Sequence, residues 1–117
     1  MKFKLLVVMT EDKQTELVIE TARAHGGTGC TIIQSARGEG LKPAKTFLGL
    51  TVAGQRDVIL LLVEEHLSRD ILEAIGAACR FDVDPGAGVA FQIDIEDAIG
   101  LRSQIETIEQ EIGEEDL

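Results

Sequence analysis

The chain has 117 residues, which is enough for one domain with a modest core and too few for two. A hydrophobic share of 44% indicates a packed globule, and an aromatic share of only 3%, with no Trp or Tyr, predicts an aliphatic core without aromatic platforms for base stacking. The formal net charge of −10 argues against attraction to nucleic acid or to an anionic membrane surface.

No segment has the pattern of a secretion signal, and no apolar run approaches the length of a membrane span. We therefore expect a cytoplasmic protein without direct membrane insertion. The two cysteines, Cys30 and Cys79, are expected to be reduced and buried as small hydrophobic residues.

The charges are unevenly distributed. Residues 102–117 carry six acidic side chains against Arg102 alone, which is half of the net negative charge. Residues 37–56 instead carry four basic side chains against one acidic one. A small basic region in an acidic protein predicts an anionic small ligand or an acidic partner surface, and scattered charge on a solvated loop is the alternative interpretation.

The first half of the chain reads as strand, helix and strand. Residues 2–9 are nearly all apolar and predict a central strand. Thr10 could cap a helix that ends at His25 and Gly26. The apolar run that follows lies between the glycine clusters at 26–29 and 38–40 and predicts a strand between two loops.

In the second half, residues 45–52 have extended character, and the turn at 53–55 leads into the apolar run 58–63, which we interpret as a hairpin. The apolar spacing over 64–80 predicts an amphipathic helix, and 89–95 predicts a final strand.

The element order is therefore βαββαβ. It predicts an α+β, ferredoxin-like fold in which an antiparallel four-stranded sheet carries two helices on one face. The run 58–63 is apolar on both sides, so the other face of the sheet needs a cover. We expect that cover to be another copy of the chain, in a homo-oligomer.

We place the domain at residues 1–101 and treat 102–117 as an acidic helical tail. Isoleucine and leucine recur there with heptad spacing, at Leu101, Ile105, Ile108 and Ile112. That seam favours three or more strands of a coiled coil. A helix that packs back on its own or a neighbouring subunit fits a seam of this length equally well.

Two motifs carry a family resemblance. The run Gly26-Gly27-Thr28-Gly29-Cys30-Thr31, with Arg37-Gly38-Glu39-Gly40 after the strand, and the run Asp84-Pro85-Gly86-Ala87-Gly88-Val89-Ala90-Phe91 resemble the PII signal-transduction family over about residues 3–102. The resemblance implies a homotrimer that binds an adenine nucleotide in clefts between subunits. It also implies that a long loop, here 38–56, regulates a partner protein such as a transporter or an enzyme.

The resemblance also assigns ligand-binding roles to individual positions. Thr31 would meet the adenine, Leu62 lies on the strand whose backbone reads the base edge, and Gly38 lies at the base of the signalling loop. The implied phosphate loop is Gly86, Ala87 and Gly88, and Arg102 lies near a basic residue of the family's C-terminal region.

The residues themselves add four basic candidates. Arg37 ends a strand beside glycines, where its guanidinium and nearby backbone N–H groups could face one anion. Lys42, Lys45 and Arg56 supply the remaining positive charge of the loop and are our candidates for partner contact.

The departures from the family pattern reduce the expected ligand charge. Val89 stands where the family has its phosphate-loop lysine, Gly100 replaces one of two paired arginines, and the loop is shorter than usual. The effector is expected to be AMP, ADP, ATP or a cyclic nucleotide, with the less charged ones favoured. Uridylylation is excluded because the chain contains no tyrosine.

Two other functions occur on the same fold. A metal-binding trimer that resembles the CutA family would use Cys30, His25 and His66 as candidate ligands, although their spacing matches no recognised metal motif. We expect no metal requirement. We also expect no enzymatic activity. An acylphosphatase on this fold would need an arginine and asparagine pair, and the chain contains no asparagine.

Overall fold

The computed structural model describes residues 1–34, 46–47, 50–51 and 56–101, and all structural statements below concern these residues. In chain order the elements are β1 (Phe3–Glu11), the short 3-10 helix η1 (Asp12–Gln14), α1 (Thr15–Ala24), β2 (Thr31–Gln34), β3 (Thr46–Phe47), β4 (Leu50–Thr51), β5 (Arg56–Glu64), α2 (Glu65–Ala78) and β6 (Gly88–Asp94).

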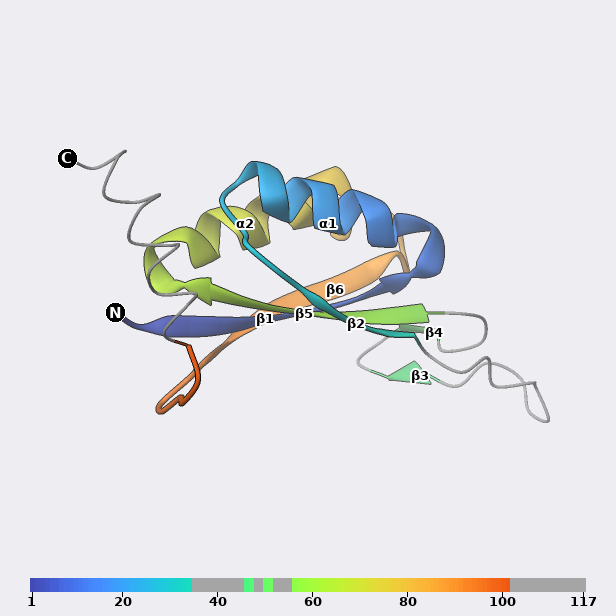
Figure 1. Ribbon diagram of the computed structural model, residues 1–117. Helices are drawn as coiled ribbons and strands as arrows, with labels where there is room; N and C mark the ends of the chain where they lie inside the picture. The colour runs from blue at the N-terminus through green and yellow to red at the C-terminus, as the bar shows by residue number, and fades with distance from the viewer. Residues whose placement is uncertain (35–45, 48–49, 52–55, 102–117) are drawn as a thin grey trace.

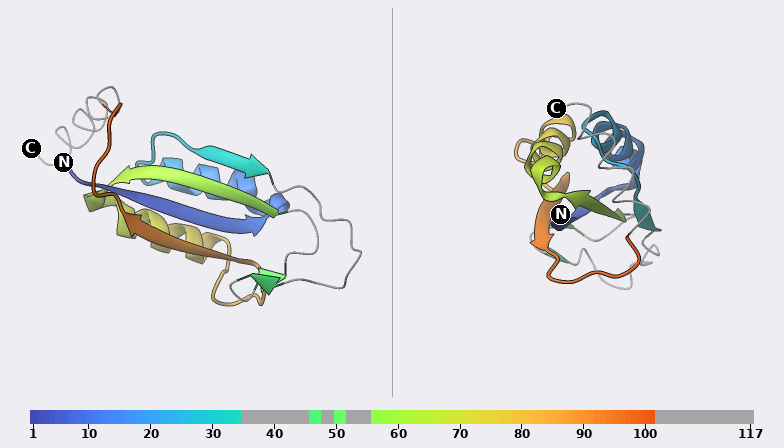
Figure 2. Two further views of the ribbon diagram at one scale, coloured as in Figure 1. Left: turned by 90° about the horizontal axis from the view of Figure 1, so that it is seen from below. Right: turned by 60° about the vertical axis from the view of Figure 1, so that its left-hand side comes forward.

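Four of the strands form one antiparallel sheet in the order β2-β5-β1-β6. Both helices lie on the same side of this sheet (Figure 1), and the view from the opposite side shows the four strands with the helices behind them (Figure 2). This arrangement confirms the predicted ferredoxin-like fold. The predicted helical tail, residues 102–117, lies outside the described residues.

Among the residues that the structure describes, no helix is both long enough and apolar enough to cross a lipid bilayer.

The start of α1 differs from the prediction. Thr10 does not cap a helix; it is a fully buried residue of β1, and its hydroxyl donates a hydrogen bond to the Ala87 carbonyl at 3.2 Å. The strand continues to Glu11, and one 3-10 turn intervenes before α1. Pairing of β1 with both β5 and β6 as far as Thr10 explains the longer strand, because an extended residue there bonds on both sides.

The predicted hairpin between 45–52 and 58–63 is wrong. β5 already has β1 on one side and β2 on the other, so both of its hydrogen-bonding edges are occupied. Within the described part of 45–52, β3 and β4 pair with each other in a separate two-stranded sheet.

The core lies between the helices and one face of the sheet, which we call the covered face. Alternate residues of β1 and β5 point into it, and Leu6, Val8 and Ile59 have no exposed area. From α2, Ile71 and Ile75 complete the layer and are also fully buried. The remaining members of the buried cluster are Val18, Ala22, Leu61, Val63 and Cys79.

The intervening residues form the opposite face, which we call the open face. It is apolar across all four strands: Leu5, Val7, Met9, Ile33, Val58, Leu60, Leu62, Val89, Phe91 and Ile93. Ile33 is 51% exposed and Ile93 is 47% exposed, whereas Leu6, Val8 and Ile59 at the centre of the covered face have no exposed area. A continuous apolar surface of this kind marks an association surface.

The two cysteines have different environments. Cys79 is buried at the end of α2, where burial raises the pKa of its thiol, as expected for a small hydrophobic residue in the core. Cys30 is exposed just before β2, so the prediction of a buried thiol is wrong there. Cys30 comes just before the edge strand β2, where it lines a small surface pocket with Ile19 and Ala22 of α1 and stays exposed.

Candidate functional site

One end of the sheet brings together the segments that the sequence singled out. A single row of paired residues crosses the strands there, from Gln34 in β2 through Asp57 in β5 and Thr10 in β1 to Gly88 in β6. The 38–56 segment enters β5 immediately beside this row, and residues 84–88, which we call the glycine turn, enter β6 at its other side.

Three hydrogen bonds hold the glycine turn. The guanidinium of Arg56 donates from Nη2 to the Gly86 carbonyl at 2.8 Å, and the Thr10 hydroxyl donates to the next carbonyl, that of Ala87. The Ala87 N–H donates within the turn to the carbonyl of Asp84 at 3.1 Å. The peptide between Gly86 and Ala87 therefore bonds on both sides inside the protein.

Both glycines of the turn have structural reasons to be glycine. Gly86 has a φ of +74°, a conformation that side-chain-bearing residues rarely adopt. A Cβ at Gly88 would lie 2.3 Å from the ring of Phe81 and 2.7 Å from the Met9 carbonyl oxygen, so no side chain fits. The predicted phosphate contact at Gly86, Ala87 and Gly88 remains a prediction beside these packing roles.

The two residues predicted to meet the base lie deeper in the sheet. Thr31 is exposed and pairs with Leu60, and Leu62 follows two residues later on the same strand. Because side chains alternate along a strand, Thr31, Leu60 and Leu62 all belong to the open face.

Thr31 and the glycine turn lie on opposite edges of the sheet, whereas Leu62 is on the central strand β5. Thr31 is on the edge strand β2, the turn precedes the other edge strand β6, and β5 and β1 lie between them. With strands about 4.8 Å apart, three spacings give a separation of about 14 Å across the sheet. One chain therefore does not bring Thr31 and Gly88 to one small ligand.

Arg56 is the partner-loop candidate that the structure describes. It is the first residue of β5, is half-buried, and lies opposite Glu11 of β1. The neighbouring Asp57 is buried and accepts a 2.6 Å hydrogen bond from the hydroxyl of Thr15 at the start of α1. The point where the 38–56 segment joins the sheet is thus fixed by contacts to β1, α1 and the glycine turn.

The other predicted site residues lie outside the described residues: Arg37, Gly38, Lys42, Lys45 and Arg102.

The first glycine motif serves the end of α1. Gly26 has a φ of +100°, and the Gly27 N–H donates to the carbonyl of Ala22 at 2.8 Å. A Cβ on Gly27 would come within 2.9 Å of that same oxygen. The helix ends at His25 and Gly26, as predicted, and Gly27 adds a further backbone bond to its last turn before the chain enters β2.

The structure does not gather the proposed metal ligands. His25 pairs with Asp70 across the two helices at 3.0 Å, and Cys30 belongs to no ligand cluster among residues 1–34 and 56–101. The one cluster found in those residues is Glu64, Glu65 and His66. Glu64 is buried there as the N-cap of α2, where it accepts the His66 N–H at 2.8 Å and pairs with the His66 ring. This arrangement explains Glu64 as a helix cap and gives the CutA-like alternative no support.

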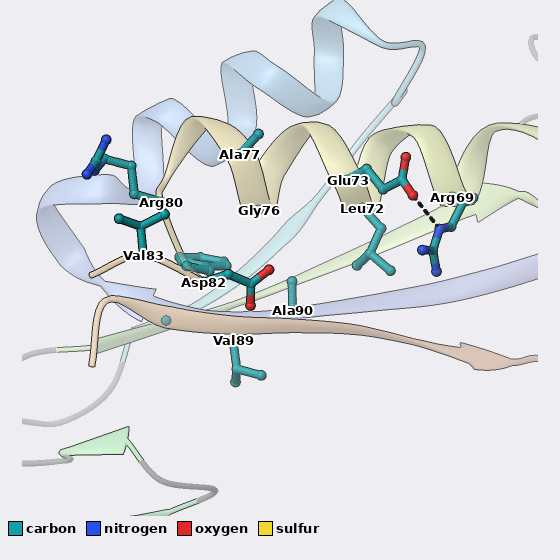
Figure 3. Close-up of a pocket in the computed structure, with 12 residues that line it drawn as sticks. Arg69, Leu72, Glu73, Gly76, Ala77, Arg80, Asp82, Val83, Val89 and Ala90 are labelled. Carbon is teal, nitrogen blue, oxygen red and sulfur yellow. Dashed lines mark hydrogen bonds and ion pairs between the residues drawn. The ribbon is translucent and has the colours of Figure 1, made fainter. Parts of the chain in front are cut away.

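A hollow of about 500 Å³ lies between α2 and the start of β6 (Figure 3). Leu72 and Ala90 point into it, whereas Val89 points to the other side of the sheet. Its two arginines are already paired, Arg69 with Glu73 at 2.8 Å and Arg80 with Asp84 at 3.1 Å. The hollow therefore offers mainly an apolar lining and no excess positive charge.

Comparison with known families identifies the fold and its lineage. The family model described as nitrogen regulatory protein P-II matches residues 3–105. The chain belongs to the P-II family. Proteins of this family are trimeric signalling regulators that act on partner proteins. A search of curated proteins finds no match to this P-II chain.

Solved structures of PII-like proteins share the fold. CPII from Thiomonas intermedia K12, solved with ADP, AMP and bicarbonate, is 23% identical over 86% of this chain and 97% of its own, with a TM-score of 0.61. A PII-like signaling protein from Thermus thermophilus is 21% identical over 80% of this chain and 87% of its own, with a TM-score of 0.56.

Sequence reasoning missed the two side chains that hold the glycine turn. Thr10 reads as a helix cap and Arg56 as a loop cation, and neither has a local signal that points to residues thirty or seventy-seven positions away. The information that could have located them is the register of β1 with β5 and β6. Once Thr10 is placed opposite both Asp57 and Gly88, its hydroxyl and the neighbouring Arg56 must lie near the turn.

Proposed function

We propose that this P-II protein is a cytoplasmic regulator that assembles as a homotrimer, binds an adenine nucleotide in clefts between subunits, and controls a partner protein through the 38–56 loop. The partner would be a transporter or an enzyme. The protein itself would have no enzymatic activity and would need no metal.

One observation carries the proposal: Thr31 and the glycine turn of the predicted site are on opposite edges of the sheet, and an uncovered apolar face lies between them. When copies pack through their open faces, the β2 edge of one can approach the glycine turn of the next. A cleft built in this way exists only in the oligomer. A ligand bound there would contact the loops at that end of the sheet, and these loops would signal its presence.

Charge favours AMP and ADP over ATP. Residues 82–90 contain two aspartates and no basic side chain, so each added phosphate meets little positive charge from the turn itself. The solved CPII structure contains ADP, AMP and bicarbonate, which supports adenine nucleotides as the first ligands to test.

The first test measures mass and binding together. Light scattering at micromolar concentration is expected to give a trimer, and calorimetric titration is expected to give heat with AMP and ADP and less heat with ATP. A monomer at these concentrations, or no heat with any adenine nucleotide, would overturn the proposal.

A point substitution tests the base-binding half of the site. Thr31→Val keeps the side-chain shape and removes the hydroxyl, so ADP affinity is expected to fall about five- to tenfold, the value of one hydrogen bond. Thr21→Val in α1 is the matched control and should leave affinity unchanged. Equal ADP binding by wild type and Thr31→Val would remove Thr31 from the site.

Charge reversal tests the loop. The double variant Lys42→Glu/Lys45→Glu is expected to bind ADP as wild type does but to lose regulation of the partner, because the partner surface is proposed to be acidic. Regulation that survives the double charge reversal would show that these two lysines do not contact the partner.

A further inference from the structure

We propose that Arg56 is the cation that binds the nucleotide phosphate at the glycine turn, and that it gives up its bond to the Gly86 carbonyl to do so. This inference rests on the proposed function, and it moves Arg56 from the partner surface to the ligand site.

The geometry places the Arg56 guanidinium at the turn. Its Nη2 lies 2.8 Å from the Gly86 carbonyl oxygen, and the side chain is half-buried rather than extended into solvent. The adjacent Asp57 anchors the backbone through its buried 2.6 Å bond from Thr15. The guanidinium is therefore held within a few ångströms of where a phosphate on the turn would lie.

The turn cannot supply this charge itself. Asp82 and Asp84 are exposed and negative, and the Arg80 side chain beside them is committed to Asp84 at 3.1 Å. Glu11, opposite Arg56, is paired with Lys13 at 3.0 Å. A phosphate on this turn would be repelled by the aspartates unless a cation from elsewhere compensates, and the fold delivers Arg56 from β5.

The exchange of partners is favourable. A backbone carbonyl is a neutral acceptor, whereas a phosphate is charged and matches the two-pronged geometry of a guanidinium. The bond to Gly86 already has a charged donor, and a phosphate adds a charged acceptor and room for a second, parallel hydrogen bond. A phosphate oxygen thus competes effectively with Gly86 for Arg56.

The exchange also offers a route from ligand to loop. Arg56 is the last residue of the 38–56 segment and the first of β5. When a phosphate draws its side chain away from Gly86, the contact between the end of this segment and the glycine turn changes. The bound and free states then differ at the point where the loop joins the sheet.

The experiment compares three ligands that share the base and ribose but differ in phosphate: adenosine, AMP and ADP. Each is titrated calorimetrically into the wild-type trimer, into Arg56→Gln and into Arg69→Gln. Arg69 is an exposed arginine on α2, so its replacement removes the same charge at a distance from the turn. Arg56→Gln is expected to weaken AMP and ADP at least tenfold and to leave adenosine unchanged, whereas Arg69→Gln should change all three less than twofold.

Wild-type binding of ADP tests the proposed function, and the variants test the inference separately. ADP binding by Arg56→Gln equal to wild type would overturn the inference and leave the proposed function standing. A parallel loss of adenosine would also overturn it, because the effect would then not concern phosphate. If Arg56→Gln fails to fold, Arg56→Lys is the second variant, because it keeps the charge without the two-pronged geometry. An intermediate loss of affinity for AMP and ADP would support the inference, and unchanged affinity would overturn it.

Discussion

The two faces of the sheet are built from similar residues and have opposite environments. The covered face presents Leu6, Val8 and Ile59 to the helices, and none of them has exposed area. The open face presents residues of the same kind, yet Ile33 and Ile93 are about half exposed. Fully burying one such side chain contributes about 1.5–3 kcal/mol. The chain's own helices cover one face, and the other would supply the driving force for the proposed assembly.

The largest effect is expected on the covered face. Leu61→Ala removes a side chain that is 2% exposed and lies in the buried cluster, so it should lower the free energy of unfolding by about 2–5 kcal/mol. Chemical denaturation followed by circular dichroism measures this loss. A cost below about 1 kcal/mol would mean that the covered layer is loosely packed.

The same strand provides the contrasting experiment one residue earlier. Leu60→Asp places a charge on the open face, where it should convert the oligomer to monomers while the helix layer stays intact. Sedimentation and circular dichroism together separate assembly from folding. Val83→Asp is the control, since Val83 is 64% exposed in the turn region and not on the open face. A Leu60→Asp protein that remains a trimer would place the interface elsewhere.

The two faces also explain how much could be predicted from the sequence. The apolar run of β5 was enough to predict that both faces of the sheet are apolar. The glycines at 26 and 86 were enough to predict two turns, and in the structure each has a positive φ. The pairing of β2 with β5 could not be predicted, because the segment 45–52 has equal strand character and only three-dimensional register decides between them. The contact of Arg56 with Gly86 depends instead on the register of β5 with β1 and of β1 with β6.

Thiol reactivity gives a smaller contrast between core and edge. In the Leu60→Asp monomer, Cys30 should react promptly with an aromatic disulfide reagent, because it is exposed. Cys79 should react only when the protein unfolds, because it is 1% exposed and burial raises its pKa and lowers its thiolate fraction. Cys30→Ser should abolish the fast phase. Two fast thiols would show that the covered layer opens readily.

The smallest effect is expected at the rim of the covered face, where Lys4 of β1 forms a salt bridge with Asp94 of β6. In the strand register, Lys4 also lies opposite Val63 of β5. The hydrogen bond from Lys4, and then its charge, hold the pKa of Asp94 below its usual range. A depressed pKa stabilises the fold above the unfolded-state value of about 4 and loses that contribution as pH falls through the folded value. Asp94→Asn should therefore lower the thermal midpoint slightly at pH 6, by an amount that shrinks as the pH is lowered, with salt reducing the difference. Because Asp94 is largely exposed, a large shift at pH 6 would show that this pair seals the covered layer rather than bordering it.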